Sequence, residues 1–468
     1  MMRFHKNCRA AVFAAVALTR LTAFANDELT NATPAAAPQD SGPASPTQPT
    51  NYPIDLPTAL RLAGARNLDI QIARTHLSEA EADRQSAVEQ FFPWINAGIG
   101  YHRRDGVAQA VPAGTISDAH FQSYYPGAAL SAQVAVGDAL YKSLAAKQLV
   151  HASDQGLEAQ RQDAILSAAQ GYFELARATA QVDVVGQALK TSQDYQQQLH
   201  AAVAAGIAFK GDELRVQSQT EHYQIAMRQA VEQRRIAAAE LARTLHLDPR
   251  VELAPQQAEF VPLTLFETNA STDKLIEQAL RSRPELKQSQ AILAAARTDQ
   301  KGTVYGPLIP SVGAQVFGGG LGGGPDGGPG NFGPQGDYTV GLSWRIGPGG
   351  LFDGGRIKAS RARAEAAELS QEKLKDDVLA EVVTAITRMQ SLSSQMELAR
   401  HNLVTAAETL RLTRERKQYG VGVVLEDIQA QQDLTQARSD YLSALAGYNK
   451  AQYRLNKAIG GLPENGRL

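Results

Sequence analysis

Two pairs of adjacent acidic residues are the first candidates for chemistry in this sequence. Asp212-Glu213 and Glu426-Asp427 each follow a glycine-containing break and begin a helical segment. Acidic side chains at a helix start are favoured by the helix dipole and can accept hydrogen bonds from its free N–H groups. If several copies of the chain surrounded a pore, the same acids would form a ring of carboxylates that selects cations. The two interpretations are compatible, and the sequence leaves both open.

Two further aspartates and one glycine-rich stretch have structural explanations. Asp138 and Asp353 each stand before a long helical segment and are predicted to be N-caps. The stretch Gly318–Gly323 matches the pattern GxGxxG, but no helix follows it. A phosphate site of this kind needs a helix N-terminus, so we interpret the stretch as a surface loop.

Other reactive constellations are missing from the sequence. The nine histidines occur singly, with no HxxxH or HExxH pattern, which argues against a metal site. There is no GxSxG motif, and the only cysteine, Cys8, precedes an apolar run near the N-terminus. We therefore predict a protein that is not an enzyme, with no catalytic residues, no metal and no cofactor.

Residues 1–25 have the pattern of a secretory signal peptide. Basic residues precede the apolar run Ala10–Leu18, and Ala23-Phe24-Ala25 has the A-x-A form of a cleavage site. Its removal takes away four basic residues and no acidic ones, which leaves 42 basic and 48 acidic residues. This mildly acidic balance gives no reason to expect nucleic acid as a partner.

The segment after the signal peptide, residues 26–55, is predicted to be a disordered tether. It is rich in Ala, Pro, Ser, Thr and Gln. No later run of about 18 apolar residues occurs, which excludes a helical transmembrane protein. The mature chain is then either exported and soluble or a membrane β-barrel.

Four short segments have the alternation of a strand with one apolar and one polar face. In residues 338–346, Val340, Leu342, Trp344 and Ile346 alternate with Thr, Gly, Ser and Arg. Residues 94–101, 129–136 and 310–317 follow the same pattern. Loops are expected over residues 102–127 and 318–336.

Long helical segments adjoin these strands. Residues 356–418 contain neither proline nor glycine, and as one helix they would reach roughly 90 Å. Their apolar residues recur at alternating spacings of three and four, which is typical of a coiled-coil seam. Further helices are predicted over residues 56–90, 138–205, 212–246, 273–301 and 425–459.

Residues that mark the ends of helices and strands recur at a nearly constant spacing, which indicates an internal duplication. Pro93 and Pro310 lie 217 positions apart, Asp138 and Asp353 lie 215 apart, and Gly206 and Gly422 lie 216 apart. The sequence therefore predicts a first repeat over residues 56–249, an irregular connector over 250–272, a second repeat over 273–461 and a tail over 462–468. Four strands cannot close a barrel, and an open sheet edge cannot sit in lipid, so several chains must pool their strands.

Several motifs resemble the TolC-like outer-membrane efflux proteins. The most specific are Leu351-Phe-Asp-Gly-Gly-Arg356, Tyr419-Gly-Val-Gly422 and the segment Leu425–Leu434. The first repeat has weaker copies in Val136-Gly-Asp138, Ala205-Gly206 and Asp212-Glu-Leu214. The resemblance covers about residues 56–461, which is nearly the whole mature chain.

The resemblance implies a mainly α fold with membrane β-structure: a homotrimer in which four strands from each protomer form one 12-stranded β-barrel in outer-membrane lipid. The helices would continue it as a coiled-coil tunnel into the periplasm, docked through a periplasmic adaptor to an inner-membrane pump. Glu426, Asp427, Asp212 and Glu213 would then lie at the constriction of the tunnel tip. Gly206, Tyr419 and Gly422 would form the tight helix turns there.

The function implied is passive conduction of substrate from a pump across the periplasm and the outer membrane. The alternative is a periplasmic coiled-coil structural or adaptor protein without a pore, which would explain the helices but not the strands. Drugs, metal ions, oligosaccharides and proteins all stay open as cargo, because a fold does not determine function.

Overall fold

The computed structural model describes residues 51–109, 114, 116–256, 260–268, 270–324, 332–418 and 424–461. The predicted signal peptide, most of the predicted tether, the 462–468 tail, and the turn residues Tyr419 and Gly422 lie outside these ranges. The structure therefore does not bear on those predictions.

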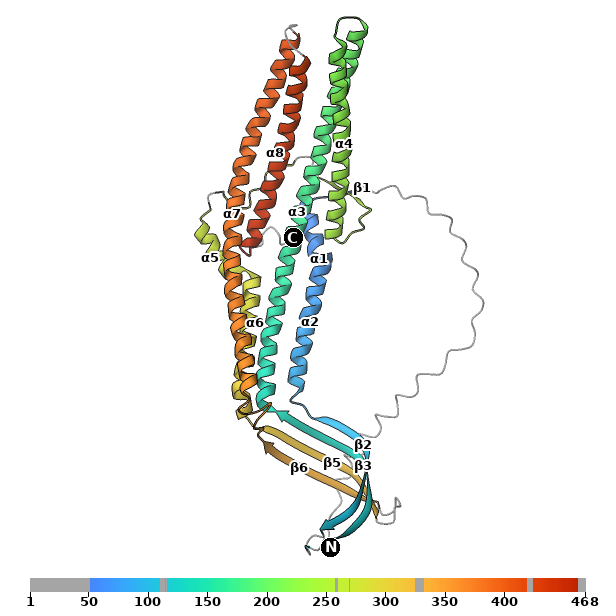
Figure 1. The fold of residues 1–468 in the computed structure, drawn as a ribbon, viewed down its shortest axis with the longest axis vertical. Coiled ribbons are helices and arrows are strands. Elements are labelled where there is room, and N and C mark those ends of the chain that lie inside the picture. The colour runs from blue at the N-terminus through green and yellow to red at the C-terminus, as the bar shows by residue number, and fades with distance from the viewer. Residues whose placement is uncertain are drawn as a thin grey trace, which may run out of the picture. The chain divides into compact units, whose positions relative to one another are not determined.

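The order of elements confirms the internal duplication (Figure 1). The first repeat contains β1 (Asn51–Ile54), α1 (Leu56–Arg66), α2 (Leu68–Glu89), β2 (Trp94–Gln109), β3 (Ile116–Ala135), α3 (Val136–Ala204) and α4 (Lys210–Thr244). The second contains β4 (Glu252–Pro255), α5 (Thr272–Ser282), α6 (Pro284–Tyr305), the 3₁₀ turn η1 (Gly306–Leu308), β5 (Ser311–Gly324), β6 (Gly333–Ser343), α7 (Gly354–Gln418) and α8 (Val424–Ala458). Each repeat is thus a short strand, two helices, two longer strands, a very long helix and a returning helix.

The four predicted strands form one antiparallel sheet in the order β2-β3-β5-β6. The strands are longer than predicted, so the loops expected over residues 102–127 and 318–336 are largely wrong. β2 and β3 pair continuously from Trp94 and Ser131 to Gln109 and Ile116. The outer part of this hairpin is held by backbone pairing without an apolar alternation, which is why the sequence pattern missed it.

The two faces of the sheet differ in the way that the alternation predicted. One face carries Ile95 and Ile99 of β2 and Val340 and Leu342 of β6, all well exposed in the single chain. The register places Ile95 opposite Leu130 and Val340 opposite Ala314, so this face is apolar across all four strands. The opposite face carries small and polar residues from the alternate positions: Asn96, Gly98, Ser131, Gly313, Gln315, Thr339 and Gly341.

Each repeat breaks its leading helix at an equivalent position, where the sequence predicted continuous helices over 56–90 and 273–301. In the first repeat, Asn67 separates α1 from α2, and its Oδ1 accepts hydrogen bonds from the backbone N–H groups of Asp69 (2.8 Å) and Ile70 (3.3 Å). In the second repeat, Arg283 precedes Pro284, and a residue before proline is disfavoured in a helix.

The long helices agree with the prediction. α3 has 69 residues, so it spans about 100 Å, and α7 has 65 residues. The hairpins α3–α4 and α7–α8 point away from the sheet, which lies at the other end of α3 and α7 (Figure 1). Buried residues such as Leu175 of α3 and Leu241 of α4 form one core, and Met389 of α7 and Leu455 of α8 belong to another.

A second, small sheet corrects the boundary of the predicted tether. β1 pairs in parallel with β4, with Ile54 opposite Pro255. Ile54 is buried in the first core, and Asp55 caps α1 by accepting a hydrogen bond from the N–H of Thr58 (3.0 Å). The folded unit therefore includes residues 51–55, and part of the predicted irregular connector is a strand.

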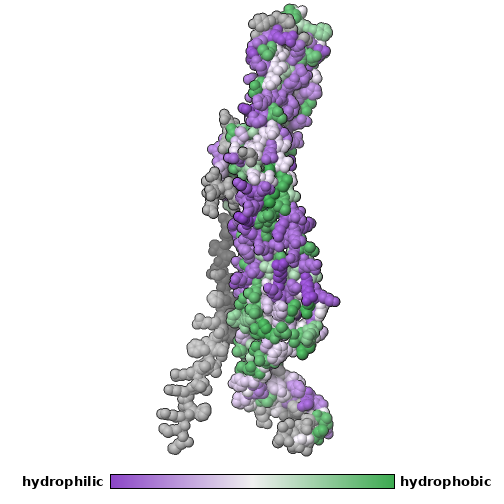
Figure 2. Space-filling model, turned by 90° about the vertical axis from the view of Figure 1, so that its left-hand side faces the viewer, coloured by the Kyte–Doolittle hydropathy of each residue, from purple (hydrophilic) through white to green (hydrophobic). Residues whose placement is uncertain are grey.

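The surface of the helices is not uniform. In Figure 2, hydrophilic residues dominate towards the hairpin tips, whereas hydrophobic residues gather at the lower end of the helical part, beside the strands. Exposed apolar residues near that end include Phe92, Leu140, Leu144, Tyr305 and Leu308. Within the described part of the chain, no helix is long and apolar enough to cross a membrane.

Candidate functional site

The predicted turn at Gly206 is present at the tip of the first hairpin. Gly206 has a φ of +74°, a left-handed conformation that costs a residue with a Cβ about 1–2 kcal/mol. Its N–H donates to the carbonyl of Val203, and the N–H of Ile207 donates to that of Ala202, both at 3.0 Å. These bonds end α3 and let α4 return beside it.

The first acidic pair lies at the start of α4, as predicted, and its two members differ in environment. Glu213 is buried, and its carboxylate accepts hydrogen bonds from Lys210 Nζ (2.6 Å) and His200 Nδ1 (2.7 Å). These bonds, that from Lys210 first, lower the pKa of Glu213. Asp212 is more exposed and lies 3.5 Å from the guanidinium of Arg215.

The second acidic pair repeats this arrangement at the start of α8. Asp427, like Glu213, is the fourth residue of its helix and is buried, and its Oδ1 lies 3.8 Å from Arg414 Nε of α7. Glu426 keeps 42% of its side chain exposed and lies 3.2 Å from Arg416. All four predicted acids are therefore paired with bases, and in each pair the first acid is the more exposed.

The basic partners were the part of the site that sequence reasoning did not find. Lys210 stands three residues before Glu213, a spacing that brings side chains together on a helix. His200 is 13 positions away and meets Glu213 only because the Gly206 turn folds α4 back along α3. Arg414 meets Asp427 across the second tip in the same way.

A hollow of about 530 Å³ separates the two hairpins near the tips. Its lining includes Asp194, Tyr195 and Gln198 of α3, Tyr223 of α4, and Arg414 and Asp427. Towards the sheet, polar contacts join the hairpins: Gln181 donates to Ser439 at 2.9 Å, and the hydroxyls of Tyr223 and Thr435 are 3.5 Å apart. Polar contacts, in addition to apolar packing, hold the two hairpins together.

One of the two predicted N-caps is wrong. Asp353 precedes α7, and its carboxylate accepts from the N–H groups of Gly349 (2.8 Å) and Arg356 (3.1 Å), bonds that lower its pKa. Asp138 is not a cap, because α3 starts earlier, at Val136, and has no side-chain cap. Asp138 instead lies 3.5 Å from the guanidinium of Arg356, so it links the starts of the two longest helices.

The glycine-rich stretch Gly318–Gly323 is also not a surface loop, because it lies inside β5. Gly319 pairs with Gly127, and the ring of Phe317 lies so close that a Cβ at either glycine would come within 2.8 Å of it. The glycines therefore make room within the sheet. Among the described residues, no group of His, Cys, Asp and Glu could hold a metal ion.

The comparison with protein families identifies the chain. A family model described as "Outer membrane efflux protein" matches residues 59–245 and 275–461. The chain belongs to the outer membrane efflux protein family. The two matched segments are the two repeats. Membership confirms the resemblance to TolC-like proteins and the prediction of an outer-membrane transport protein, not an enzyme.

Nodulation protein T of Rhizobium leguminosarum bv. viciae is 26% identical over 235 residues, which is 48% of this chain and 46% of that protein. The chain thus matches about half the length of this curated relative. Among solved structures, the outer-membrane channel OprN has a TM-score of 0.73 at 18% identity and covers 93% of this chain and 98% of its own. The Campylobacter jejuni CmeC outer membrane channel has a TM-score of 0.73 at 17% identity, with 93% and 94% covered. These structures confirm the predicted fold of one protomer, with long helices and a four-stranded antiparallel sheet.

Proposed function

We propose that this efflux protein is the outer-membrane channel of a tripartite efflux or secretion system and that it acts as a homotrimer. The observation that carries the proposal is the open sheet. β2 and β6 each pair on one side only within the chain, and one sheet face is apolar while the other is polar. Three such sheets joined edge to edge give about 12 strands, within the range of outer-membrane barrels, with the apolar face towards lipid.

The helices support a duct made by more than one chain. Four of the five large apolar residues that α7 keeps exposed recur at intervals of 14 or 15 positions, namely Leu369, Val383, Leu398 and Leu412; the fifth is Val404. Such spacings are close to four helical turns, so these four residues share one face of α7. In the trimer that face packs on a neighbouring protomer, and the helices form the wall of a periplasmic tunnel.

The far end of the tunnel is the proposed contact with a periplasmic adaptor, which joins the channel to an inner-membrane pump. Ile207 and Phe209, in the turn between α3 and α4, are 81% and 74% exposed. Exposed apolar residues at a helix turn far from the membrane are suited to a protein partner. We assign the adaptor contact to this turn.

The acidic pairs are the proposed constriction of the tunnel tip. Glu426 and Asp212 are the more exposed members, so they supply the carboxylates that attract cations when three protomers surround the axis. The buried members, Asp427 and Glu213, fix the starts of α8 and α4. The same four residues thus serve the pore and the helix ends.

Planar-bilayer conductance of detergent-extracted protein, with native mass measured on the same sample, tests the channel. We expect discrete conductance steps from a trimer. A monomer without conductance would refute the channel and leave the periplasmic structural or adaptor protein as the interpretation. No structural observation favours that alternative, because it gives the two-faced sheet no role.

Substitution tests the constriction separately from the channel. Glu426→Gln removes the more exposed carboxylate, and we expect a lower preference for cations in single-channel recordings. Asp427→Asn is the matched variant, and its main expected effect is on the stability of the tip because its side chain is buried. Unchanged cation preference in both variants, and in the double variant, would remove the acids from the conduction mechanism.

A further inference from the structure

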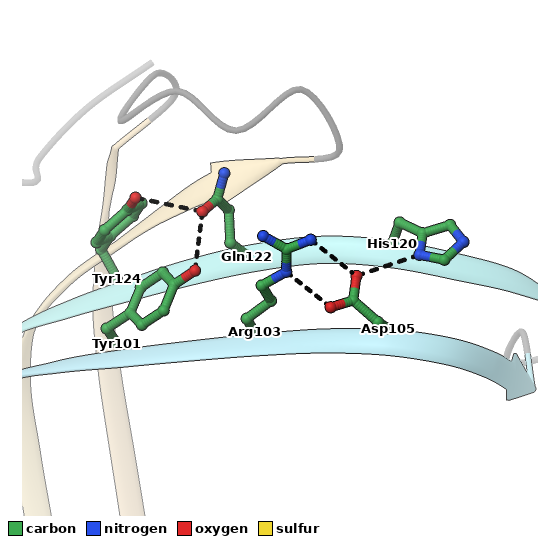
Figure 3. Close-up of polar contacts among 6 residues, drawn as sticks. All are labelled: Tyr101, Arg103, Asp105, His120, Gln122 and Tyr124. Carbon is green, nitrogen blue, oxygen red and sulfur yellow. Dashed lines mark hydrogen bonds and ion pairs between the residues drawn. The ribbon is translucent and has the colours of Figure 1, made fainter.

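A cluster of polar side chains projects from the outer part of the β2–β3 hairpin (Figure 3). Arg103 Nε donates to Asp105 Oδ2 at 2.7 Å, and Arg103 Nη2 donates to Asp105 Oδ1 at 3.3 Å. His120 stands opposite Asp105 in the register, and its Nδ1 lies 3.2 Å from the same Oδ1. One carboxylate therefore holds two basic side chains beside each other.

The cluster lies on the apolar face of the sheet. Arg103 and Asp105 are on the same side of β2 as Ile95 and Ile99, because side chains alternate along a strand. A basic and an acidic side chain on this face cannot lie in hydrocarbon at low cost. They must lie beyond its edge.

The length of β3 fixes where that edge falls. On this face of β3, apolar positions run from Val134 to Pro126 and end at Tyr124. Ten residues of a strand tilted by about 40° rise about 25 Å, which is the height of the apolar band of an outer-membrane barrel. On this face Arg103 comes directly after Tyr101, the partner of Tyr124, and His120 comes after Gln122, so both lie beyond the end of the band.

Aromatic rings mark the same level. The rings of Tyr101 and Tyr124 are 5.2 Å apart, and both hydroxyls donate to Gln122 Oε1, at 3.0 and 3.4 Å. On the next strand Gly322 pairs with Tyr124, and the ring of Phe332 occupies the space above this glycine. A row of aromatic side chains at one height is the usual boundary between the hydrocarbon and the headgroups.

We propose that Arg103 and His120 form a binding site for the phosphate of a lipid headgroup, with Asp105 as the positioning residue. The inference rests on the proposed membrane role of the sheet. A guanidinium can bind phosphate through two parallel hydrogen bonds, and Asp105 engages only Nε and Nη2 of Arg103. The side chains of Arg103 and His120 are 61% and 68% exposed, so a headgroup can reach them.

The orientation of the polar groups bears on the same ligand. The charges of the guanidinium and the carboxylate cancel, and because His120 Nδ1 faces Asp105, the second ring nitrogen is a donor in the protonated imidazolium, whose positive charge favours an anion. Because Gln122 Oε1 faces the tyrosine hydroxyls, its amide nitrogen points away from them (Figure 3). Asp105 thus lies between its two bases, and Nη1 of Arg103, which Asp105 does not engage, is available to a ligand.

Native mass spectrometry of the detergent-extracted protein tests the site. The probes are lipid A carrying its phosphates and the same lipid after phosphatase treatment. In Arg103→Gln/His120→Gln we expect about a tenfold or larger loss of affinity for the phosphorylated lipid, because charge-assisted hydrogen bonds are lost. Arg104→Gln is the matched control, because Arg104 is on the opposite face of the same strand, and it should bind as the wild type does.

The positioning role of Asp105 has its own readout. Asp105→Asn should weaken binding of the phosphorylated lipid and leave binding of the dephosphorylated lipid unchanged, whereas a general loss of structure would lower both. Equal binding of both lipids by the wild type, or wild-type affinity in the double variant, would overturn the proposal. Binding of inorganic phosphate as tight as that of the phosphorylated lipid would assign the site to the free ion and would also overturn it.

Conductance measured on the same samples separates this inference from the proposed channel. If wild type and double variant conduct equally and only the variant loses phosphorylated lipid, the lipid site is supported beside an intact channel. If neither the wild type nor the double variant conducts, the channel proposal fails. The lipid-binding measurements still decide the proposal of the phosphate site.

Discussion

The two repeats build the same architecture with different side-chain chemistry, and their helix breaks show this most directly. Asn67 and Arg283 are 216 positions apart, in line with the duplication. Asn67 turns the chain with a local cap on α2. Arg283 is 4% exposed, and its guanidinium reaches Glu285 (3.0 Å) and, on α7, Glu381 (2.5 Å). The same backbone turn is thus stabilised in one repeat by the cap and by a hydrogen bond from Asn67 Nδ2 to the carbonyl of Thr244 (3.4 Å), and in the other by a buried guanidinium that pairs with two carboxylates.

The two repeats also differ in the side chains of their sheet hairpins and of their long helices. The β2–β3 hairpin is longer and carries the charged cluster, whereas β5 has consecutive glycines. On α3, Glu174 binds Lys450 of α8, whereas Gln390, 216 positions later on α7, donates to the carbonyl of Thr268. The two repeats share the positions at which the backbone turns and the strands pair. The side-chain interactions that stabilise these positions differ between the repeats.

The largest difference between the repeats is expected when the residues at the two helix breaks, Arg283 and Asn67, are substituted. Arg283→Ala removes the buried guanidinium that pairs with Glu285 and Glu381, and because the two carboxylates left behind are 21% and 44% exposed, we expect a loss of about 2–3 kcal/mol in the free energy of unfolding. Asn67→Ala removes the cap and the hydrogen bond to the carbonyl of Thr244, and it should cost about 1–2 kcal/mol. Denaturant unfolding of the detergent-extracted protein measures both.

The control for this comparison is Arg281→Ala. Arg281 pairs with Glu277 on the exposed surface of α5, so its loss should cost less than about 1 kcal/mol. Equal losses in the variants of Arg283 and Arg281 would show that the buried ion pair does not stabilise the second break.

A smaller effect on stability is expected from glycine substitutions at the tips of the two helical hairpins. Gly206→Ala places a Cβ at a φ of +74° and should cost about 1–2 kcal/mol. Gly186→Ala is the matched control, because Gly186 lies within α3 with no atom within 4 Å of an added Cβ, and it should stabilise by about 0.5–1 kcal/mol. The sequence predicts the same turn at Gly422, so a similar loss in Gly422→Ala would extend the equivalence to the second tip. Thermal unfolding of the three variants shows whether each substitution raises or lowers the stability.

The sequence predicted the backbone plan because the plan depends on local patterns. Alternation located all four strands, uninterrupted helical periodicity located α3 and α7, and glycine located the first tip. It underestimated the strands because residues such as Arg103 and Gly319 pair through backbone hydrogen bonds that need no apolar alternation. It missed the break at Asn67 because asparagine does not by itself end a helix, whereas the break at Arg283 was marked in the sequence by Pro284 and was overlooked.

The site was predictable only in part, for a related reason. The acids at the starts of α4 and α8 were visible as residues that follow a break in a helical pattern. Their partners were not, because His200 and Arg414 reach Glu213 and Asp427 only after the chain has turned back. Asp138 was misassigned as a cap because α3 begins two residues earlier than the glycine suggests, at Val136.

The smallest expected effect concerns the ion pair of Glu174 and Lys450, because the equivalent residue of the second repeat, Gln390, carries no charge. Burial opposes ionisation of Glu174, but hydrogen bonds from Arg177 and Lys450 outweigh it and lower its pKa to about 2. A carboxyl with a lowered folded pKa adds stability above its unfolded pKa, about 4.5, and loses it as the pH falls towards 2. Since a third of the side chain is exposed, we expect about 1 kcal/mol.

Glu174→Gln tests this linkage by the difference in the free energy of unfolding between wild type and variant. The difference should be constant from neutral pH down to about pH 5 and then shrink as the pH falls further. Gln390→Glu is the reciprocal variant, because it places a carboxylate at the equivalent position of α7, where a backbone carbonyl is the partner. It should destabilise at neutral pH and recover as the pH falls. The same pH dependence in both variants would mean that position in the repeat, and not the local ion pair, sets the effect.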